Sequence, residues 1–325
     1  AVTGTARPDD DASSSAGGGV ECAAVFDAED ARDADSPVWL FAARAVKAHA
    51  AVAFADDASG ARFKQAGTSG CLVALALAVS PFAECTVSIG GKSAKGGAAS
   101  KKKRAVALPA AIARDGLKLP NADVDAVDKL LSKAPEARDL VARYFAAAAP
   151  SSSSSSQSGT AATSTAGLIR RDVGAFLFEA RSLWRDVLAV SRAVELAACD
   201  ATVWGVATPD EGQDDPLRLR LDAPRAKHIL AMYADFADAV AEPGRLNLDG
   251  VWTSLVPYFD GKAVMSDLGV APGPRVGLVL KEQRDFQLQH PDADRAQCQA
   301  HLEAWIRESA SSSSSSANKK QRRSA

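Results

Sequence analysis

Residues 167–194 read GLIRRDVGAFLFEARSLWRDVLAVSRAV, and this stretch decides the expected fold class. In its second half, apolar side chains recur every three or four residues, at Leu183, Val187, Val190 and Val194. This spacing places them on one face of an α-helix, whereas a β-strand would require alternation. Charged residues lie between them, so the pattern predicts an amphipathic helix that packs on other helices.

The same spacing recurs on both sides of this stretch. In residues 21–147 it relates Val38, Phe41, Ala45, Ala48 and Val52, and later Val124, Val127 and Leu131. Pro135 is predicted to end that later helix, because proline lacks an N–H group. In residues 166–241 the spacing continues through Ile229, Tyr233, Phe236 and Val240. We therefore predict an all-α protein with a helical body in two parts, 21–147 and 166–241.

Strand signals are scarce. Only ATVWGVA, residues 201–207, combines β-branched and aromatic residues as a strand would, and it fits the end of a helix equally well.

Four segments have the composition of linkers or disordered chain. They are the N-terminus (1–20), a Gly- and Lys-rich flexible insertion (88–105), a Ser-rich linker (148–165) and a basic tail (309–325). A third block, 242–308, follows the second part of the body and precedes the basic tail. We predict that it forms a small helical tail domain.

The third block contains GVAPGPRVGLVLKEQRDFQLQHPDADR, residues 269–295. Gly269 suits the left-handed position after a helix, and Pro274 suits the first residue of the next one, where a missing N–H costs nothing. A further helix would place Cys298, Leu302, Trp305 and Ile306 on one face.

Bulk properties exclude some classes of protein. A formal net charge of −2 and a pI near 6.2 exclude a uniformly basic nucleic-acid binder. The five cysteines form no CxxC pair and have no zinc spacing with the histidines, which indicates thiols in the core of a protein from a reducing compartment. The longest apolar run, CLVALALAVSPF from Cys71, is too short to span a bilayer and predicts a buried helix.

Two carboxylate pairs have the i and i+2 spacing that two-metal catalysis uses on a strand. Asp123 and Asp125 lie in a helical pattern, where their side chains would diverge. Asp292 and Asp294 stand just before the next helix, where an aspartate more often serves as its N-cap. The GGKS of residues 90–93 lacks the first glycine of a P-loop. We predict no catalytic residue and no metal ligand in this chain.

Basic residues offer two secondary candidate RNA contacts. Arg170 and Arg171, next to Asp172, could hold a phosphate, although the exposed first turn of an amphipathic helix explains them as well. The cluster Lys101, Lys102, Lys103 and Arg104 could neutralise phosphates without sequence preference, as could KKQRR at residues 319–323. Solvated linker charge, or a nuclear-import signal at the C-terminus, is the alternative.

Residues 249–306 resemble the C-terminal tail of eukaryotic CCA-adding tRNA nucleotidyltransferases, which belong to the poly(A) polymerase-like family. The residues that follow the order of that tail are Trp252, Pro257, Gly261-Lys262, Leu268-Gly269, Pro272-Gly273-Pro274, Gly277, Gln287-Leu288, Cys298 and Trp305. Residues 75–82, 108–131 and 167–191 are similar to helices of the body of that family. The resemblance therefore covers a body and a tail.

The catalytic motifs of that family are missing. The head motifs GGxVRD and DxD are absent, Glu29 to Arg32 lacks the spacing of the neck motif EDxxR, and Arg170 to Asp172 lies too late in the chain for the neck motif RRD. The chain begins with Ala1, and we expect a fragment whose head lies upstream. The Mg²⁺ ions and the CTP or ATP of the full-length enzyme would belong to that head, and this chain alone should transfer no nucleotide.

The resemblance implies that the chain holds the acceptor stem and outer corner of tRNA, in a mitochondrion, plastid, cytosol or nucleus, with no membrane or DNA partner. A proline-led helix start presents outward N–H groups and the positive end of a dipole to phosphate. The candidate RNA-binding residues are Lys262, Gly273, Pro274, Arg275, Lys281 and Arg284, which could also form a mixed solvated face. A free-standing helical RNA-binding protein, or a protein-interaction scaffold without salt-dependent tRNA binding, is the alternative.

Overall fold

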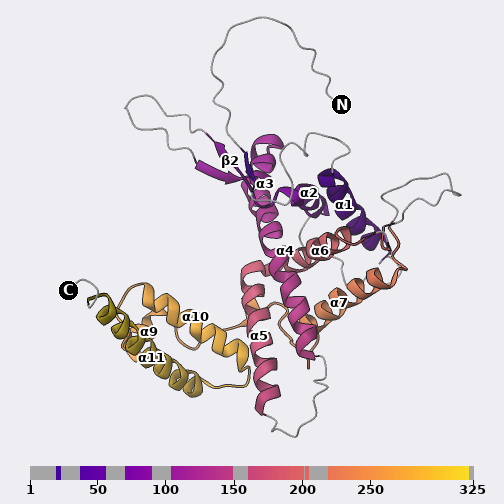
Figure 1. Ribbon diagram of the computed structural model, residues 1–325. Coiled ribbons are helices and arrows are strands. Elements are labelled where there is room, and N and C mark those ends of the chain that lie inside the picture. Colours follow the sequence, from indigo (N-terminus) through magenta and orange to yellow (C-terminus); the bar gives the residue numbers. More distant parts are fainter. Residues whose placement is uncertain are drawn as a thin grey trace, which may run out of the picture.

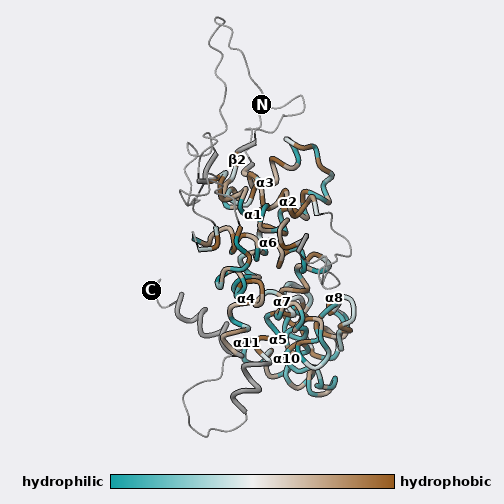
Figure 2. Tube along the Cα trace, turned by 90° about the vertical axis from the view of Figure 1, so that its right-hand side faces the viewer, coloured by the Kyte–Doolittle hydropathy of each residue, from teal (hydrophilic) through white to brown (hydrophobic). Residues whose placement is uncertain are grey.

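The computed structural model describes residues 20–22, 37–55, 70–89, 104–148, 160–200, 202–204 and 219–321. For some residues at the ends of these ranges, such as 160–166 and 310–321, only the backbone is described. Helices make up most of the described chain, which confirms the all-α prediction (Figure 1). The alternation of brown and teal along the helices in Figure 2 reflects the periodicity seen in the sequence.

Five helices build the body around one hydrophobic core. Their bounds are α1 (Pro37–Ala55), α2 (Gly70–Val79), α4 (Asn121–Ala148), α6 (Trp184–Ala197) and α7 (Pro224–Ala241). Helix α6 lies at the centre, in contact with the other four. Its polar residues Asp186, Ser191 and Arg192 are buried along with its apolar ones. Neighbouring helices therefore cover α6 on most sides, as the prediction of helix-on-helix packing requires.

Helix α4 runs unbroken through Pro135, so the prediction that this proline ends the helix is also wrong. A proline inside a helix removes one backbone hydrogen bond and costs about 3 kcal/mol. Both halves of α4 are buried in the same core, through Val127 and Leu130 before the proline and Leu140 and Val141 after it. Burial of both halves against the body offsets that cost.

A small antiparallel sheet was not predicted. Its strands are β1 (Val20–Cys22), β2 (Cys85–Ile89) and β3 (Arg104–Ala107), in the order β1-β2-β3. Strands of three to five residues are too short to establish a period of two in the sequence. Ile89 pairs with Arg104, so the ends of the expected insertion 88–105 belong to the ladder. At 201–207, by contrast, Trp204 forms a single β-bridge with Leu219.

The cysteines follow the prediction in part. Cys85 is disulfide-bonded, which contradicts the expectation of thiols throughout, and Cys22 lies opposite it in the ladder. Spacing along the chain did not reveal this, because strand pairing brings together residues that are far apart in sequence. Cys298 is a buried thiol whose burial raises its pKa to about 11, as expected for a core residue.

After β3 the chain forms α3 (Leu108–Ala111) and η4 (Ile112–Gly116), and the long helix α5 (Thr160–Ala180) with η5 (Arg181–Leu183) leads into α6. Helix α5 begins within the expected linker 148–165. It joins the body core through Val173, Phe176 and Leu177. An alanine Cβ at Gly174 would lie 2.5 Å from Cδ2 of Leu288 in the tail, so glycine allows the tail to approach closely.

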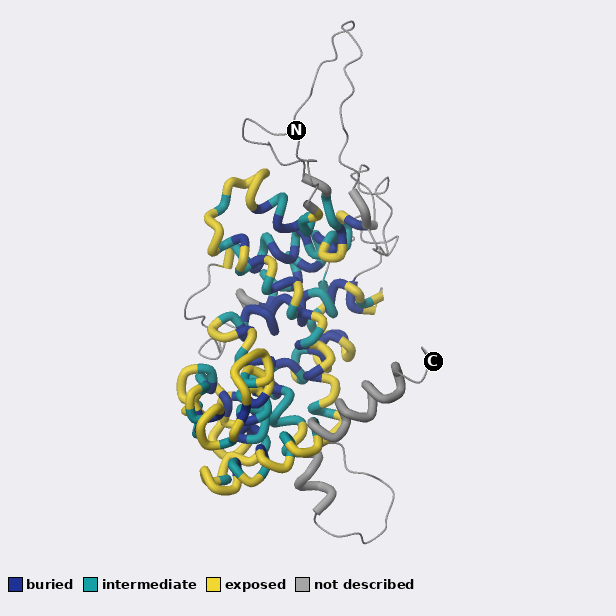
Figure 3. The backbone as a smooth tube through the Cα atoms, turned by 90° about the vertical axis from the view of Figure 1, so that its left-hand side faces the viewer, coloured by how far each residue is buried: buried dark blue, intermediate teal, exposed yellow. Residues whose placement is uncertain are grey.

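The tail consists of α8 (Val251–Ser254), α9 (Gly261–Asp267), α10 (Pro274–Gln289) and α11 (Arg295–Gln321). It has a core of its own, made by Phe259, Val264, Val270, Val279, Cys298 and Leu302. Exposed residues are most frequent in the lower part of Figure 3, where Figure 1 places α9 and α10. The tail is therefore a small helical layer docked on α5 through α10.

The predicted helix boundaries in the tail are confirmed. Gly269 has φ +65°, and Pro274 is the first residue of α10. The Asp294 carboxylate accepts from the Gln297 amide at 2.8 Å, while the Gln297 side chain accepts from the Asp294 amide at 3.0 Å. Helix α11 continues to Gln321, into the expected basic tail 309–325, because extending a formed helix costs less than nucleating one.

Candidate nucleic-acid interface

Two helix starts converge in the tail. Asp260 caps α9 by accepting a hydrogen bond from the Ala263 amide at 2.7 Å. The next residue, Gly261, lies close to the first turn of α10, since an alanine Cβ there would be 3.8 Å from Cγ1 of Val276. Lys262, which follows Gly261, is exposed. The fold thus brings Lys262 near the start of α10, as the sequence alone could not show.

The start of α10 depends on Gly273. Its φ of +144° lies in a region that side-chain-bearing residues rarely adopt, and no atom lies within 4 Å of the position of a Cβ. The glycine is therefore needed for backbone conformation and leaves open space beside Pro274. Both residues are exposed. The Val276 amide donates to the Gly273 carbonyl at 3.1 Å, which closes the first turn.

Arg275 ties two helices together. Its Nη2 donates to the Ile306 carbonyl at 2.9 Å and to the Ser309 hydroxyl at 3.1 Å, both on α11. The side chain remains exposed. Arg275 thus has a structural role. A phosphate bound at the start of α10 would compete with α11 for the hydrogen bonds of the Arg275 guanidinium.

Lys281 and Arg284 lie further along α10 and do not join the group at its start. The Arg284 guanidinium carbon lies 5.1 Å from the centroid of the Phe178 ring on α5. Lys281 and Arg284 both help to lower the pKa of Glu179, after the larger effect of its hydrogen bond from Lys133. These two candidates therefore stabilise the contact between α10 and α5.

The candidates Arg170 and Arg171 are engaged within the protein. They lie in the middle of α5, so the prediction that they form its first turn is wrong. Arg170 donates to the Leu246 carbonyl, and its burial lowers its pKa. Arg171 pairs with Asp172 at 3.0 Å, and Asp172 also accepts from Arg143 at 2.6 Å. Arg170 and Arg171, the candidates for holding a phosphate, are therefore already engaged by partners within the protein.

Of the second basic cluster, only the backbone of Arg104 is described, and it lies far from the tail. Lys101, Lys102 and Lys103 lie outside the described residues, as do 1–19 and 322–325. The backbone of Arg104 begins β3, in the sheet at the upper end of Figure 1, whereas α9 and α11 lie at the lower left.

Arg295 is a tail cation that is not among the candidates predicted from the sequence. Its guanidinium carbon lies 4.7 Å from the centroid of the Phe259 ring, and Nη2 lies 3.5 Å from Asp267. The sequence signal that could have identified Arg295 as a candidate is its position directly after the expected aspartate cap, at the start of α11. Acidic residues outnumber basic ones between 242 and 308, so the tail as a whole carries no excess positive charge.

The acidic residues form no metal site in the part of the chain that the structure describes. No group of three or more His, Cys, Asp or Glu residues there could hold an ion. Asp123 and Asp125 lie on helix α4, where residues two apart point in different directions. These residues do not fit the paired Mg²⁺ ions of a nucleotidyltransferase. Among the helices of the described ranges, none combines the length and apolar character that a membrane crossing requires.

Comparison with known proteins gives no match: no family model, no curated protein and no solved structure matches this chain. The resemblance to CCA-adding enzymes therefore depends on the residues quoted above.

Proposed function

We propose that this chain is the tRNA-binding body and tail of a CCA-adding tRNA nucleotidyltransferase. The observation that supports the proposal is the convergence of the starts of α9 and α10, where Gly261 lies close to Val276 in the first turn of α10. Gly261, Lys262 and Gly273 carry the resemblance in sequence; Lys262 and Gly273 are exposed, and Gly261 is half-buried. Among the other residues that match, Cys298 is buried in the hydrophobic core of the tail and Trp305 packs against it.

The mode of binding follows from the chemistry of this surface. RNA helices hide most base edges, so proteins hold them by shape and by contacts to phosphate and 2′-hydroxyl groups. The start of α10 supplies backbone N–H donors and a positive dipole end, and Lys262 adds one full charge, whereas the Asp260 carboxylate already caps the start of α9. With acidic side chains nearby, we expect weak binding that depends on few phosphate contacts.

Nucleotide transfer is not assigned to the described residues. The paired Mg²⁺ ions and CTP or ATP need a carboxylate set that the described residues do not form. The role of this chain in CCA addition would be to position the tRNA.

The test measures binding of tRNA to the whole chain. The fluorescence anisotropy of labelled tRNA reports the affinity at salt concentrations between about 50 and 200 mM. We expect affinity to fall with salt and Lys262→Gln to weaken binding, with the slope of log affinity against log salt smaller by about one. Lys118→Gln is the matched control, since Lys118 is exposed near α3 and should leave binding unchanged.

Three outcomes would contradict the proposal. Absence of salt-dependent tRNA binding would favour the protein-interaction scaffold. Equal effects of Lys262→Gln and Lys118→Gln would exclude the helix starts of the tail as the interface. Incorporation of labelled CTP by the purified chain would show that the catalytic residues are present after all.

A further inference from the structure

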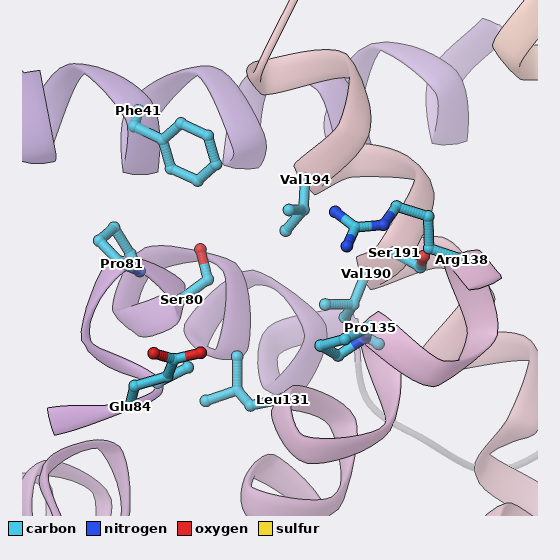
Figure 4. A pocket seen from close by; sticks show the side chains of 12 residues that line it. Phe41, Ser80, Pro81, Glu84, Leu131, Pro135, Arg138, Val190, Ser191 and Val194 are labelled. Atoms are coloured by element: carbon cyan, nitrogen blue, oxygen red, sulfur yellow. The ribbon is translucent and has the colours of Figure 1, made fainter. Parts of the chain in front are cut away.

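A cavity of about 460 Å³ lies in the body, away from the tail, where α1, η3 (Ser80–Phe82), α4 and α6 meet (Figure 4). Its volume is that of a typical small-molecule site. Most of the lining is apolar and includes Phe41, Leu131, Val190 and Val194. Nothing in the proposed tRNA contact uses this cavity.

Pro135 lies in the cavity wall and alters the backbone there. Because proline has no N–H, the carbonyl of Leu131 lacks the donor that a helix would normally supply four residues later. Leu131 lines the same cavity. The break in the hydrogen-bond ladder of α4 therefore coincides with the hollow between the helices.

Ser191 is the buried polar group of the wall, with 2% of its surface exposed. Its hydroxyl lies 2.8 Å from the Tyr233 hydroxyl, which donates to Oε2 of Glu195 at 3.0 Å. Burial raises the pKa of Tyr233, so the phenol remains protonated. Since Tyr233 gives its one proton to Glu195, Ser191 must donate its own proton to Tyr233. Ser191 can then only accept from a ligand.

Arg138 is the charged donor among the described residues of the lining. Its Nε lies 3.8 Å from Asp139, beyond hydrogen-bonding distance, and 54% of the side chain is exposed. The guanidinium can therefore turn to bind an anion at the mouth of the cavity. Ser80, also in the lining, donates its proton to the Leu77 carbonyl at 2.8 Å and is left as an acceptor.

Glu84 makes the two ends of the cavity differ in charge. Figure 4 shows Glu84 and Arg138 on opposite sides, with Ser80 on the side of Glu84. A bound anion is attracted to Arg138 and repelled by Glu84. At the other end, Glu84 and Ser80 favour a group that donates hydrogen bonds. The apolar wall lies between the two ends.

We propose that this cavity binds a small aromatic monocarboxylate that carries a hydroxyl group at the opposite end. The carboxylate pairs with Arg138, the ring packs between Phe41, Leu131 and Val194, and the hydroxyl donates to Glu84 or Ser80. The site is independent of tRNA binding.

The first test uses 6-hydroxy-2-naphthoate, a fluorescent molecule of this class, titrated with the whole chain. We expect one saturable site. 2-Naphthol, which lacks the carboxylate, should bind roughly tenfold more weakly or worse, because a charge-assisted hydrogen bond is lost. 2-Naphthoate, which lacks the hydroxyl, should bind roughly fivefold more weakly. No saturable binding, or equal affinity for hydroxynaphthoate and naphthol, would overturn the proposal.

The second test assigns the site. Arg138→Gln should weaken hydroxynaphthoate roughly tenfold and leave 2-naphthol unchanged. Lys129→Gln removes a positive charge from the same helix outside the cavity and should change neither affinity. Val194→Trp should fill the cavity and abolish binding of both, with circular dichroism confirming that the chain is folded. Equal affinities of the Arg138→Gln and Lys129→Gln variants would show that the ligand binds elsewhere.

Discussion

Single glycines decide how closely the tail approaches the body. Gly167 and Gly174 lie seven residues apart on α5, two turns along the same face, opposite Gln289 and Leu288 of α10. A Cβ at either position would lie 3.0 Å or less from a side-chain atom of α10. The contact between body and tail thus depends on the absence of two side chains.

Gly174→Ala should destabilise the protein. The new methyl group meets the buried Leu288, and overpacking of this kind costs about 1–3 kcal/mol, of which better helix propensity returns about 1 kcal/mol. The matched control is Gly277→Ala on α10, where nothing lies within 4 Å and a gain of about 0.5–1 kcal/mol is expected. Urea unfolding measures both. A gain in stability from Gly174→Ala would contradict the close approach.

Residue-scale predictions from sequence succeeded where the signal is local. Gly269, Pro274 and Asp294 act on their own helix ends, so a few neighbouring residues specify their conformation. Gly174 gave no such signal, because its role depends on Leu288, more than a hundred residues away. For the same reason the cation–π contact of Arg284 with Phe178 was invisible in the sequence.

Helices α4 and α5 are joined by a charged contact at the element scale. Lys133 on α4 donates to Glu136 at 2.9 Å and also to Glu179 on α5. The hydrogen bond from Lys133 holds the pKa of Glu179 below its ordinary value. Since a lowered carboxyl pKa means tighter interaction of the ionised form, this contact stabilises the folded state at neutral pH.

The contribution of Glu179 should therefore be lost on acidification. It is complete above the unfolded carboxyl pKa of about 4.3 and disappears as the pH falls through the lower folded value. A double-mutant cycle with Lys133→Met and Glu179→Gln, measured by urea unfolding, should give a favourable coupling at neutral pH and none in strong acid. Coupling that persists in acid would contradict an ionic contact.

Periodicity correctly indicated which segments are helices and was less accurate about their surroundings. It identified α4 and α6 but predicted a break at Pro135. This error arises from packing. The core holds α4 together across its proline, and neighbouring helices bury Asp186 and Arg192. The sheet was missed because pairing between distant short strands leaves little local pattern.

At the scale of the whole molecule, the residues that the structure describes form two main hydrophobic cores. The body core includes Leu288 of α10 together with Leu246, Leu248 and Val251 at the start of the tail, whereas α9, α11 and the rest of α10 pack around Phe259, Val279 and Leu302. Because the clusters are separate, we expect the tail to unfold locally without the body.

Leu302→Ala should weaken the tail alone. Truncation of a buried leucine costs about 2–5 kcal/mol, and here the loss falls on the smaller core. Hydrogen exchange should show faster exchange of amides in α9 to α11 and unchanged protection in α6. Leu188→Ala, in the body core, is the matched control and should speed exchange in α6. Uniformly faster exchange in Leu302→Ala would show that both cores unfold together.

Local sequence patterns were enough to specify the helical class, the start of α10 and the residues on which the resemblance to tRNA nucleotidyltransferases depends. These follow from local chemistry, because spacing, caps and glycine conformations act over a few residues. Only the tertiary structure decided that Lys262 lies near the start of α10, that Arg170 and Arg284 are engaged internally, and that a cavity lies beside Pro135. Such features arise where residues distant in sequence meet, and packing in three dimensions alone brings them together.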